Sequence, residues 1–346
     1  MKNKQACANS QLFVLLLACL ISDFLLPGLS VGQQTMRAQT VLLGLAVQGV
    51  LLWGLFVLLC NTVVNFRQFA LCRYLLMGAV LASLALELAQ GQRFYSHAQA
   101  SVLSMGAFLL LMFGAAFYGV YSGLHALCRT AGAILTLCAA SLLFLFLSLV
   151  PQLHFTGLEP GSLSLEQVVQ ASWAQLYLPP ELLLWSLFAQ EDQQGKTRCA
   201  GQGAKLFALL FGIQAFVAIL GEMAMGSSYW QQEQPVFNLA RLGGISVFRR
   251  LDALHGSVWL LLLLLKITVY CLALVQLLKY SRPSIPKHLP YALAVAGVLA
   301  MFVILRSGSE QLLYQWQQWL LIAAAVSVLV RGWINWPQKS KKEACS

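Results

Sequence analysis

The sequence predicts an all-α integral membrane protein with about ten transmembrane helices, and its composition and its long apolar runs support this fold class. Only 10% of the residues are charged, whereas a soluble domain carries about 25%. The apolar residues make up 59% of the chain and form runs long enough to cross ~30 Å of hydrocarbon, which takes roughly 20 helical residues. Because lipid offers no hydrogen bonds to the backbone, such runs must be helical.

The first apolar segment needs its own argument, because Lys2 and Lys4 precede it as in a secretory signal peptide. No small-x-small cleavage site follows the segment, which ends near Pro27. A second long apolar run begins at Val41. We therefore predict that residues 11–30 form the first membrane helix, and a signal peptide is the alternative interpretation.

The other helices are predicted from the apolar runs that follow. They are expected at residues 40–60, 70–90, 101–122, 130–150, 176–190, 203–225, 252–280, 289–306 and 315–334. Four tryptophans bracket the last helix, as aromatic residues do at membrane interfaces: Trp316, Trp319, Trp333 and Trp336. Two long loops, at 151–175 and 226–250, are expected on the outer side with short surface helices. The whole chain, 1–346, is predicted to be one polytopic membrane domain.

The charge distribution predicts the orientation. The net charge of +10 would suggest nucleic acid as a partner of a soluble protein. Here most Lys and Arg residues lie in loops on the side of the N-terminus, as the positive-inside rule describes. We expect cytoplasmic N- and C-termini and no nucleic-acid partner. The nine cysteines show no CxxC spacing and lie mostly in apolar runs, so neither a zinc site nor a disulfide framework is expected.

Two predicted helices are interrupted at matching positions, if ten helices divide into two halves of five. The interrupting residues are Ser22, Asp23, Pro27 and Gly28 in the first helix, and Pro179, Pro180 and Glu181 in the sixth. Proline removes a backbone donor, and glycine tolerates unwound dihedrals, so a small ligand can bind the freed backbone groups. We predict a ligand site between these breaks. The alternative is that the prolines merely end the first helix and begin the sixth.

Ionisable residues inside apolar helices mark functional sites, because each costs at least ~2.5–3.5 kcal/mol to insert. Lys266 lies at the centre of the helix predicted at 252–280, and Thr268 follows it as a further candidate ligand contact. Lys266 is expected to lie against the break in the first helix, balanced by Asp23 or Glu181. Alternatively it pairs with Glu87, away from the ligand site. Glu87 itself is expected at a solvated helix end.

No catalytic or metal-binding motif appears in the sequence. The five histidines are widely separated, and no G-x-S-x-G, H-E-x-x-H or P-loop pattern is present. We expect no enzymatic activity, no cofactor and no metal.

Four stretches of the chain resemble the B subunit of spore germination nutrient receptors, a family also called spore permeases. They are residues 121–129 (YSGLHALCR), 149–161 (from LVP to LEPG), 178–182 (LPPEL) and 248–266 (FRRLDAL, then Trp259 and Lys266). Their order and spacing follow the family along nearly the whole chain. One departure is Pro179-Pro180, where the family often has Gly or Phe before the acidic residue.

This resemblance implies a fold of the amino acid/polyamine/organocation transporter superfamily, with two inverted five-helix repeats and broken helices 1 and 6. The repeats would span roughly residues 11–150 and 176–334. It also implies a multi-pass protein of the spore inner membrane that assembles with an A subunit and a lipoprotein C subunit. The implied role is recognition of a small nutrient, typically an amino acid. The alternative function is secondary transport of an amino acid.

Overall fold

The computed structural model of the chain describes residues 9–25, 38–61, 69–98, 105–154, 166, 168–169, 172, 177–188, 196–232, 234–243, 251–281 and 310–343. The described part is helical, and no strand occurs within it. Its helices are α1 (Asn9–Leu25), α2 (Ala38–Asn61), α3 (Ala70–Ala98), α4 (Met105–Ser122), α5 (Leu124–Leu149), η1 (Val150–Gln152), α7 (Glu181–Phe188), α8 (Lys196–Met225), η3 (Gly226–Gln231), α9 (Pro235–Leu242), α10 (Leu251–Ser281) and α12 (Glu310–Glu343).

Each predicted membrane helix except one overlaps a helix of the structure, and the exception, 289–306, lies outside the described residues. α5 begins at Leu124 and not at residue 130, where the sequence predicted its start. Gly123 alone connects α4 to α5, in place of the predicted loop. This glycine has a φ of 85°, and its N–H donates to the Gly119 carbonyl at 3.2 Å. A left-handed glycine lets α4 turn directly into α5. Arg129 therefore lies within α5 and not in a connecting loop.

Within the described residues, six helices are long and apolar enough to cross a membrane: Gln39–Leu59, Ala70–Ser96, Leu124–Gln152, Gly201–Trp230, Asp252–Ser281 and Leu312–Val330. Two shorter apolar helices, Ser10–Asp23 and Gly106–Ser122, accompany them. The chain is thus a multi-pass membrane protein. The count of ten spans and the inverted repeats remain predictions.

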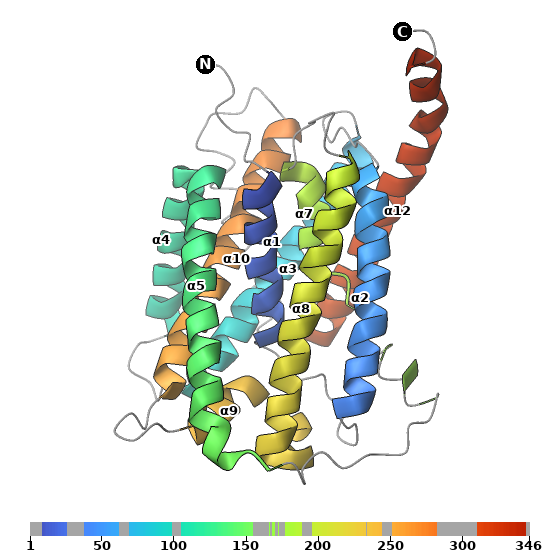
Figure 1. The fold of residues 1–346 in the computed structure, drawn as a ribbon. Helices are drawn as coiled ribbons and strands as arrows, with labels where there is room; N and C mark the ends of the chain where they lie inside the picture. Colours follow the sequence, from blue (N-terminus) through green and yellow to red (C-terminus); the bar gives the residue numbers. More distant parts are fainter. Residues whose placement is uncertain are drawn as a thin grey trace.

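The helices form a bundle in which α10 is central (Figure 1). It packs against α1, α3, α4, α5 and α9, and 83% of its membrane span is buried. Only 28% of the α2 span is buried, which places α2 at the periphery against α8. The first turn of α1 and the last turns of α12 lie at the same end of the bundle (Figure 1).

The second long loop contains helices, as predicted, but α9 is not a surface helix. Its residues Val236, Phe237 and Leu239 are buried, and α9 packs against α8 and α10. The ring of Phe237 lies 5.1 Å from that of Phe94 on α3. The apolar face of α9 is covered by these neighbouring helices. After η1, residues 155–175 lie almost entirely outside the described part.

Candidate functional site

The centre of the bundle holds a lysine among three acids from three other helices. Lys266 lies in the apolar middle of α10, and its side chain is fully buried. Asp23 lies near the end of α1, Glu87 within α3, and Glu181 is the first residue of α7. We call these four residues the charged cluster. Residues far apart in the sequence thus meet at one point of the fold.

Lys266 pairs with all three acids of the charged cluster. Its Nζ donates hydrogen bonds to Asp23 Oδ1 and, at 2.5 Å, to Glu87 Oε1. Glu181 Oε1 lies 3.4 Å from the same nitrogen. Lys266 therefore connects α10 electrostatically to α1, α3 and α7. The sequence left two alternatives for Lys266, pairing with Asp23 or Glu181, or pairing with Glu87. In the structure, Lys266 pairs with all three acids at one place.

Glu87 is not at a solvated helix end, and this expectation was wrong. The residue is 4% exposed, and α3 continues past it to Ala98. The predicted helix ended at residue 90, which placed Glu87 close to its end. The contact with Lys266 shows that Glu87 lies at the depth of that residue. Glu222 on α8 is also 4% exposed.

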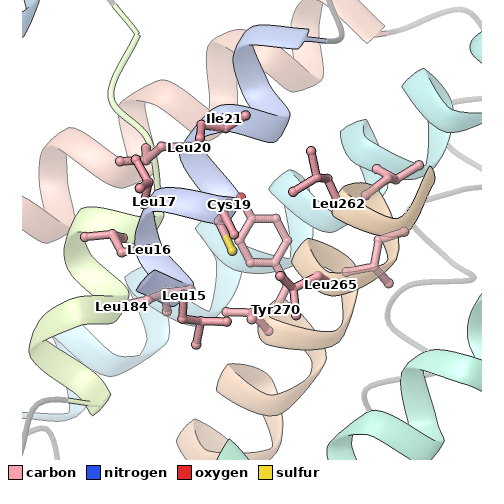
Figure 2. Packing of buried hydrophobic residues seen from close by; sticks show 14 of the residues in the cluster. Leu15, Leu16, Leu17, Cys19, Leu20, Ile21, Leu184, Leu262, Leu265 and Tyr270 are labelled. Carbon is pink, nitrogen blue, oxygen red and sulfur yellow. The ribbon is translucent and has the colours of Figure 1, made fainter. Parts of the chain in front are cut away.

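Tyr270 also forms a hydrogen bond with Glu181. Its hydroxyl donates to Glu181 Oε1 at 2.5 Å, one helical turn after Lys266 on α10. Apolar side chains of α1, α7 and α10 surround this region, including Leu16, Leu184 and Leu265 (Figure 2). Cys19 of α1 lies among them (Figure 2). The charged cluster is therefore enclosed in a low-dielectric environment, in which ionic interactions are strong and unpaired charges are costly.

Each acid of the charged cluster retains one oxygen without a hydrogen-bond partner among the described residues: Asp23 Oδ2, Glu87 Oε2 and Glu181 Oε2. Asp23 differs from the other two because its side chain is 21% exposed, against 6% for Glu87 and 1% for Glu181. Ser22, next to Asp23 on α1, is fully buried, and its hydroxyl also has no partner there. Asp23 is therefore the most exposed of the three acids, although its unpartnered Oδ2 is itself buried.

Pro179 and Pro180 begin α7, as the alternative interpretation of the sequence stated. The N–H of Leu182 donates to the Pro179 carbonyl at 3.2 Å, and the N–H groups of Leu183 and Leu184 donate to the Pro180 carbonyl at 3.0 Å. These first-turn N–H groups are thus already bonded and do not face a ligand carboxylate in this conformation. Pro27 and Gly28, the corresponding break in the first helix, lie outside the described residues.

Glutamine side chains bind the extended segment before α7. The N–H of Leu178 donates to Gln318 Oε1 of α12 at 3.0 Å, and Gln48 of α2 contacts the Tyr177 carbonyl at 3.5 Å. Gln317 Nε2 donates to Ser83 Oγ at 2.8 Å. Backbone groups at membrane depth need such partners, because lipid provides none. Protein side chains therefore satisfy these two backbone groups, and ligand contacts of Pro179 and Pro180 remain a prediction.

Replacing Gln318 with leucine is expected to lower the free energy of unfolding by about 1–3 kcal/mol, because the buried Leu178 N–H loses its acceptor. Denaturation of the purified protein in mixed micelles measures this change. Gln315→Leu is the matched control, since Gln315 is exposed on the same helix. Equal stability of the two variants would contradict the assigned bond.

Thr268 lies apart from the charged cluster. Its hydroxyl donates to the Leu264 carbonyl at 2.7 Å, and a Cβ placed on Gly119 of α4 would lie 2.6 Å from the Thr268 methyl group. Thr268 thus faces α4, and we do not include it in the site proposed below. Its contact with a ligand remains an untested prediction.

Sequence reasoning missed the neutral polar residues of this region: Tyr177, Tyr270, Gln317 and Gln318. Charge was the property that marked candidate residues in the apolar segments, and these four residues are uncharged. A usable signal was present, because adjacent glutamines in an otherwise apolar helix are costly unless they find partners. Which partners they find depends on α2, α3 and the segment before α7, and the sequence of α12 does not specify these.

Comparisons with known proteins identify the family. A family model described as spore germination protein, that of the spore permeases, matches residues 97–311. The match includes Glu181, Lys266 and Tyr270, whereas Asp23 and Glu87 precede it. No curated protein matched the chain. Because the family model covers well over half of this multi-pass chain, the protein belongs to the spore permease family of spore germination proteins.

Proposed function

We propose that the chain is the membrane-embedded nutrient-sensing subunit of a spore germination receptor and that its nutrient is an amino acid. The observation that carries this proposal is the position of Asp23. One of its carboxylate oxygens pairs with Lys266, while the other has no partner among the described residues. An amino acid brings an ammonium group, which is the natural partner for such an oxygen.

Binding at Asp23 offers a direct route to a signal. A ligand changes a conformational equilibrium only if it binds the two states unequally. The ligand ammonium and Lys266 compete for the Asp23 carboxylate, so the ligand favours a state in which α1 is released from α10. Movement of α1 against α10 would then be transmitted through the bundle, because α10 contacts α3, α4 and α5 as well.

The resemblance supports the finer parts of this proposal. We propose that the chain adopts the inverted-repeat fold of the amino acid/polyamine/organocation transporters, with cytoplasmic termini in the spore inner membrane. We also propose that it assembles with an A subunit and a lipoprotein C subunit. These partners would receive the movement of α1.

A binding assay on the purified full chain tests the proposed function. A panel of amino acids is added to protein in lipid nanodiscs, and tryptophan fluorescence reports binding, because Trp185 lies on α7 beside the site. Asp23→Asn is expected to weaken binding at least about tenfold, the loss of one charged contact. An N-acetylated form of the ligand, which lacks the ammonium, is expected not to bind.

Asp252→Asn is the matched control, because Asp252 lies in the first turn of α10 and outside the charged cluster. Binding that is equal in Asp23→Asn and Asp252→Asn would remove Asp23 from the site. If no amino acid binds the unaltered protein, the proposed ligand class is wrong. Accumulation of an amino acid in proteoliposomes would instead favour secondary transport, the alternative function.

A further inference from the structure

The charged cluster contains more acids than its cations can balance. Asp23, Glu87 and Glu181 face a single ammonium group, that of Lys266. Among the described residues, no other cation pairs with these acids. If all three were ionised, the cluster would hold two uncompensated negative charges in a nearly dry environment. The cost of burying even one unpaired charge is several kcal/mol, so a further cation is required.

The space beside Glu181 limits what that cation can be. A cavity of about 20 Å³, counted as the volume open to the centre of a water-sized sphere, lies between α1, α7 and α10. This is room for one water molecule, since a single water needs ~10–15 Å³ on this measure. The lining is Leu12, Leu15, Leu16, Cys19, Glu181, Leu184, Trp185, Phe188 and Val269. Among these described residues, Glu181 is the one that supplies a carboxylate.

A metal cation does not suit this cavity. Hard cations take six or more oxygen ligands, whereas the lining is almost entirely apolar. Lys266 also occupies the point at which the three acids converge. A proton needs no coordination shell and moves along a single water. The cation that fits both the charge deficit and the cavity is therefore a proton.

We propose that the charged cluster is a proton-binding site, which holds two protons among its three carboxyl groups when no ligand is present. Protons pass through the cavity beside Glu181. Its residues on α1 precede Asp23, and those on α7 follow Glu181, so the cavity extends from the cluster toward the first turn of α1. The proposed proton route thus leads toward the side of the membrane that holds the start of α1.

Four other titratable groups of the described residues lie around the cluster. They are Cys19 on α1, Tyr177 before α7, Tyr270 on α10 and Tyr314 on α12, and each interacts electrostatically with one or more of the acids. All four are neutral groups when protonated, so none of them supplies the missing positive charge. The Tyr270 hydroxyl already donates a hydrogen bond to Glu181 Oε1. The protons of the cluster therefore belong to the carboxyl groups.

Infrared spectroscopy of the full chain without any nutrient tests the proton site. The unaltered protein at neutral pH is expected to show the carbonyl stretch of a protonated carboxyl group. Combining Asp23→Asn, Glu87→Gln and Glu181→Gln is expected to abolish that band. Glu222→Gln, which removes a buried acid of α8 outside the cluster, is expected to retain it. A band that survives the triple change, or that disappears with Glu222→Gln, would overturn the proposal.

A second variant keeps the test valid if the triple change prevents folding. Leu16→Phe fills the cavity without altering any acid, and Leu17→Phe enlarges a neighbouring buried residue that does not line the cavity. After transfer into deuterated buffer, the carboxyl band of Leu16→Phe is expected to shift at least about tenfold more slowly than that of Leu17→Phe, because filling this water-sized space closes the proposed route. Equal exchange rates would exclude the cavity as the proton path.

If the proposed nutrient function also holds, the ligand ammonium displaces one of the protons, and this consequence rests on that function. One proton leaves to bulk water for each amino acid bound, so affinity is expected to rise about tenfold per pH unit over the range in which the cluster is protonated. Calorimetry in buffers of different ionisation enthalpy counts the protons released. A count of zero, with the infrared band confirmed, would mean that ligand and proton occupy different places.

Discussion

Replacing Lys266 with methionine is expected to lower the free energy of unfolding by about 3–5 kcal/mol, since removing one partner of a buried ion pair leaves its counter-charges uncompensated. Methionine keeps the length of the side chain and removes the charge. The three acids of α1, α3 and α7 then face one another without a cation. Denaturation in mixed micelles measures the loss, and the same variant is expected to fail in nutrient signalling.

Two comparisons separate loss of the charge from loss of the side chain. Lys279→Met removes an exposed lysine of the same helix and is expected to change the stability little. Adding Glu87→Gln to Lys266→Met is expected to restore part of the lost stability, because it removes one of the repelling acids. Glu87→Gln alone is expected to be mild, since two acids remain for Lys266. If the Lys266→Met protein is as stable as the Lys279→Met protein, the stabilising role of the Lys266 ion pairs is refuted.

Lysine and arginine are not expected to be interchangeable at this position. The planar guanidinium of arginine requires more room and a forked arrangement of acceptors. Lys266 is fully buried and directs one nitrogen toward three separate carboxylates. Lys266→Arg therefore preserves the charge and still disturbs the packing of α10.

Replacing Trp259 with alanine is expected to cost about 3–5 kcal/mol, the usual loss for a large aromatic residue of a packed core. Trp259 is 2% exposed on α10, and its ring centroid lies 4.0 Å from that of Phe94 on α3. Phe94 in turn contacts Phe237 of α9. The space left by the missing indole would therefore loosen α9 from α3 and α10. This loosening is expected to lower the denaturation midpoint and to increase proteolysis near α9.

Trp259→Phe distinguishes packing from hydrogen bonding. The Trp259 indole N–H has no hydrogen-bond partner among the described residues, so phenylalanine loses no such bond and is expected to be far milder than alanine. Trp319→Ala is the control, because Trp319 is 69% exposed on α12 and should contribute little to the core. An equal loss of stability in the phenylalanine and alanine variants would contradict the packing argument.

The sequence alone determined the approximate positions of the membrane helices that the structure describes, and that Lys266 must face inward. Both conclusions depend on properties of single segments. A run of some 20 apolar residues has to be helical in lipid, and a lysine in the middle of such a run is too costly to leave facing hydrocarbon. Asp23 and Glu181 became candidates for the same reason. The structure brings these two residues to Lys266.

Only the tertiary structure decided what surrounds those residues. Glu87 joins the charged cluster because α3 extends to Ala98 and packs against α10, whereas the predicted helix ended at residue 90. The segment before α7 is bound by Gln48 and Gln318, which belong to helices distant in sequence. Hydropathy reports how readily a segment leaves water, but the face and depth at which a side chain finds its partner depend on how the helices pack.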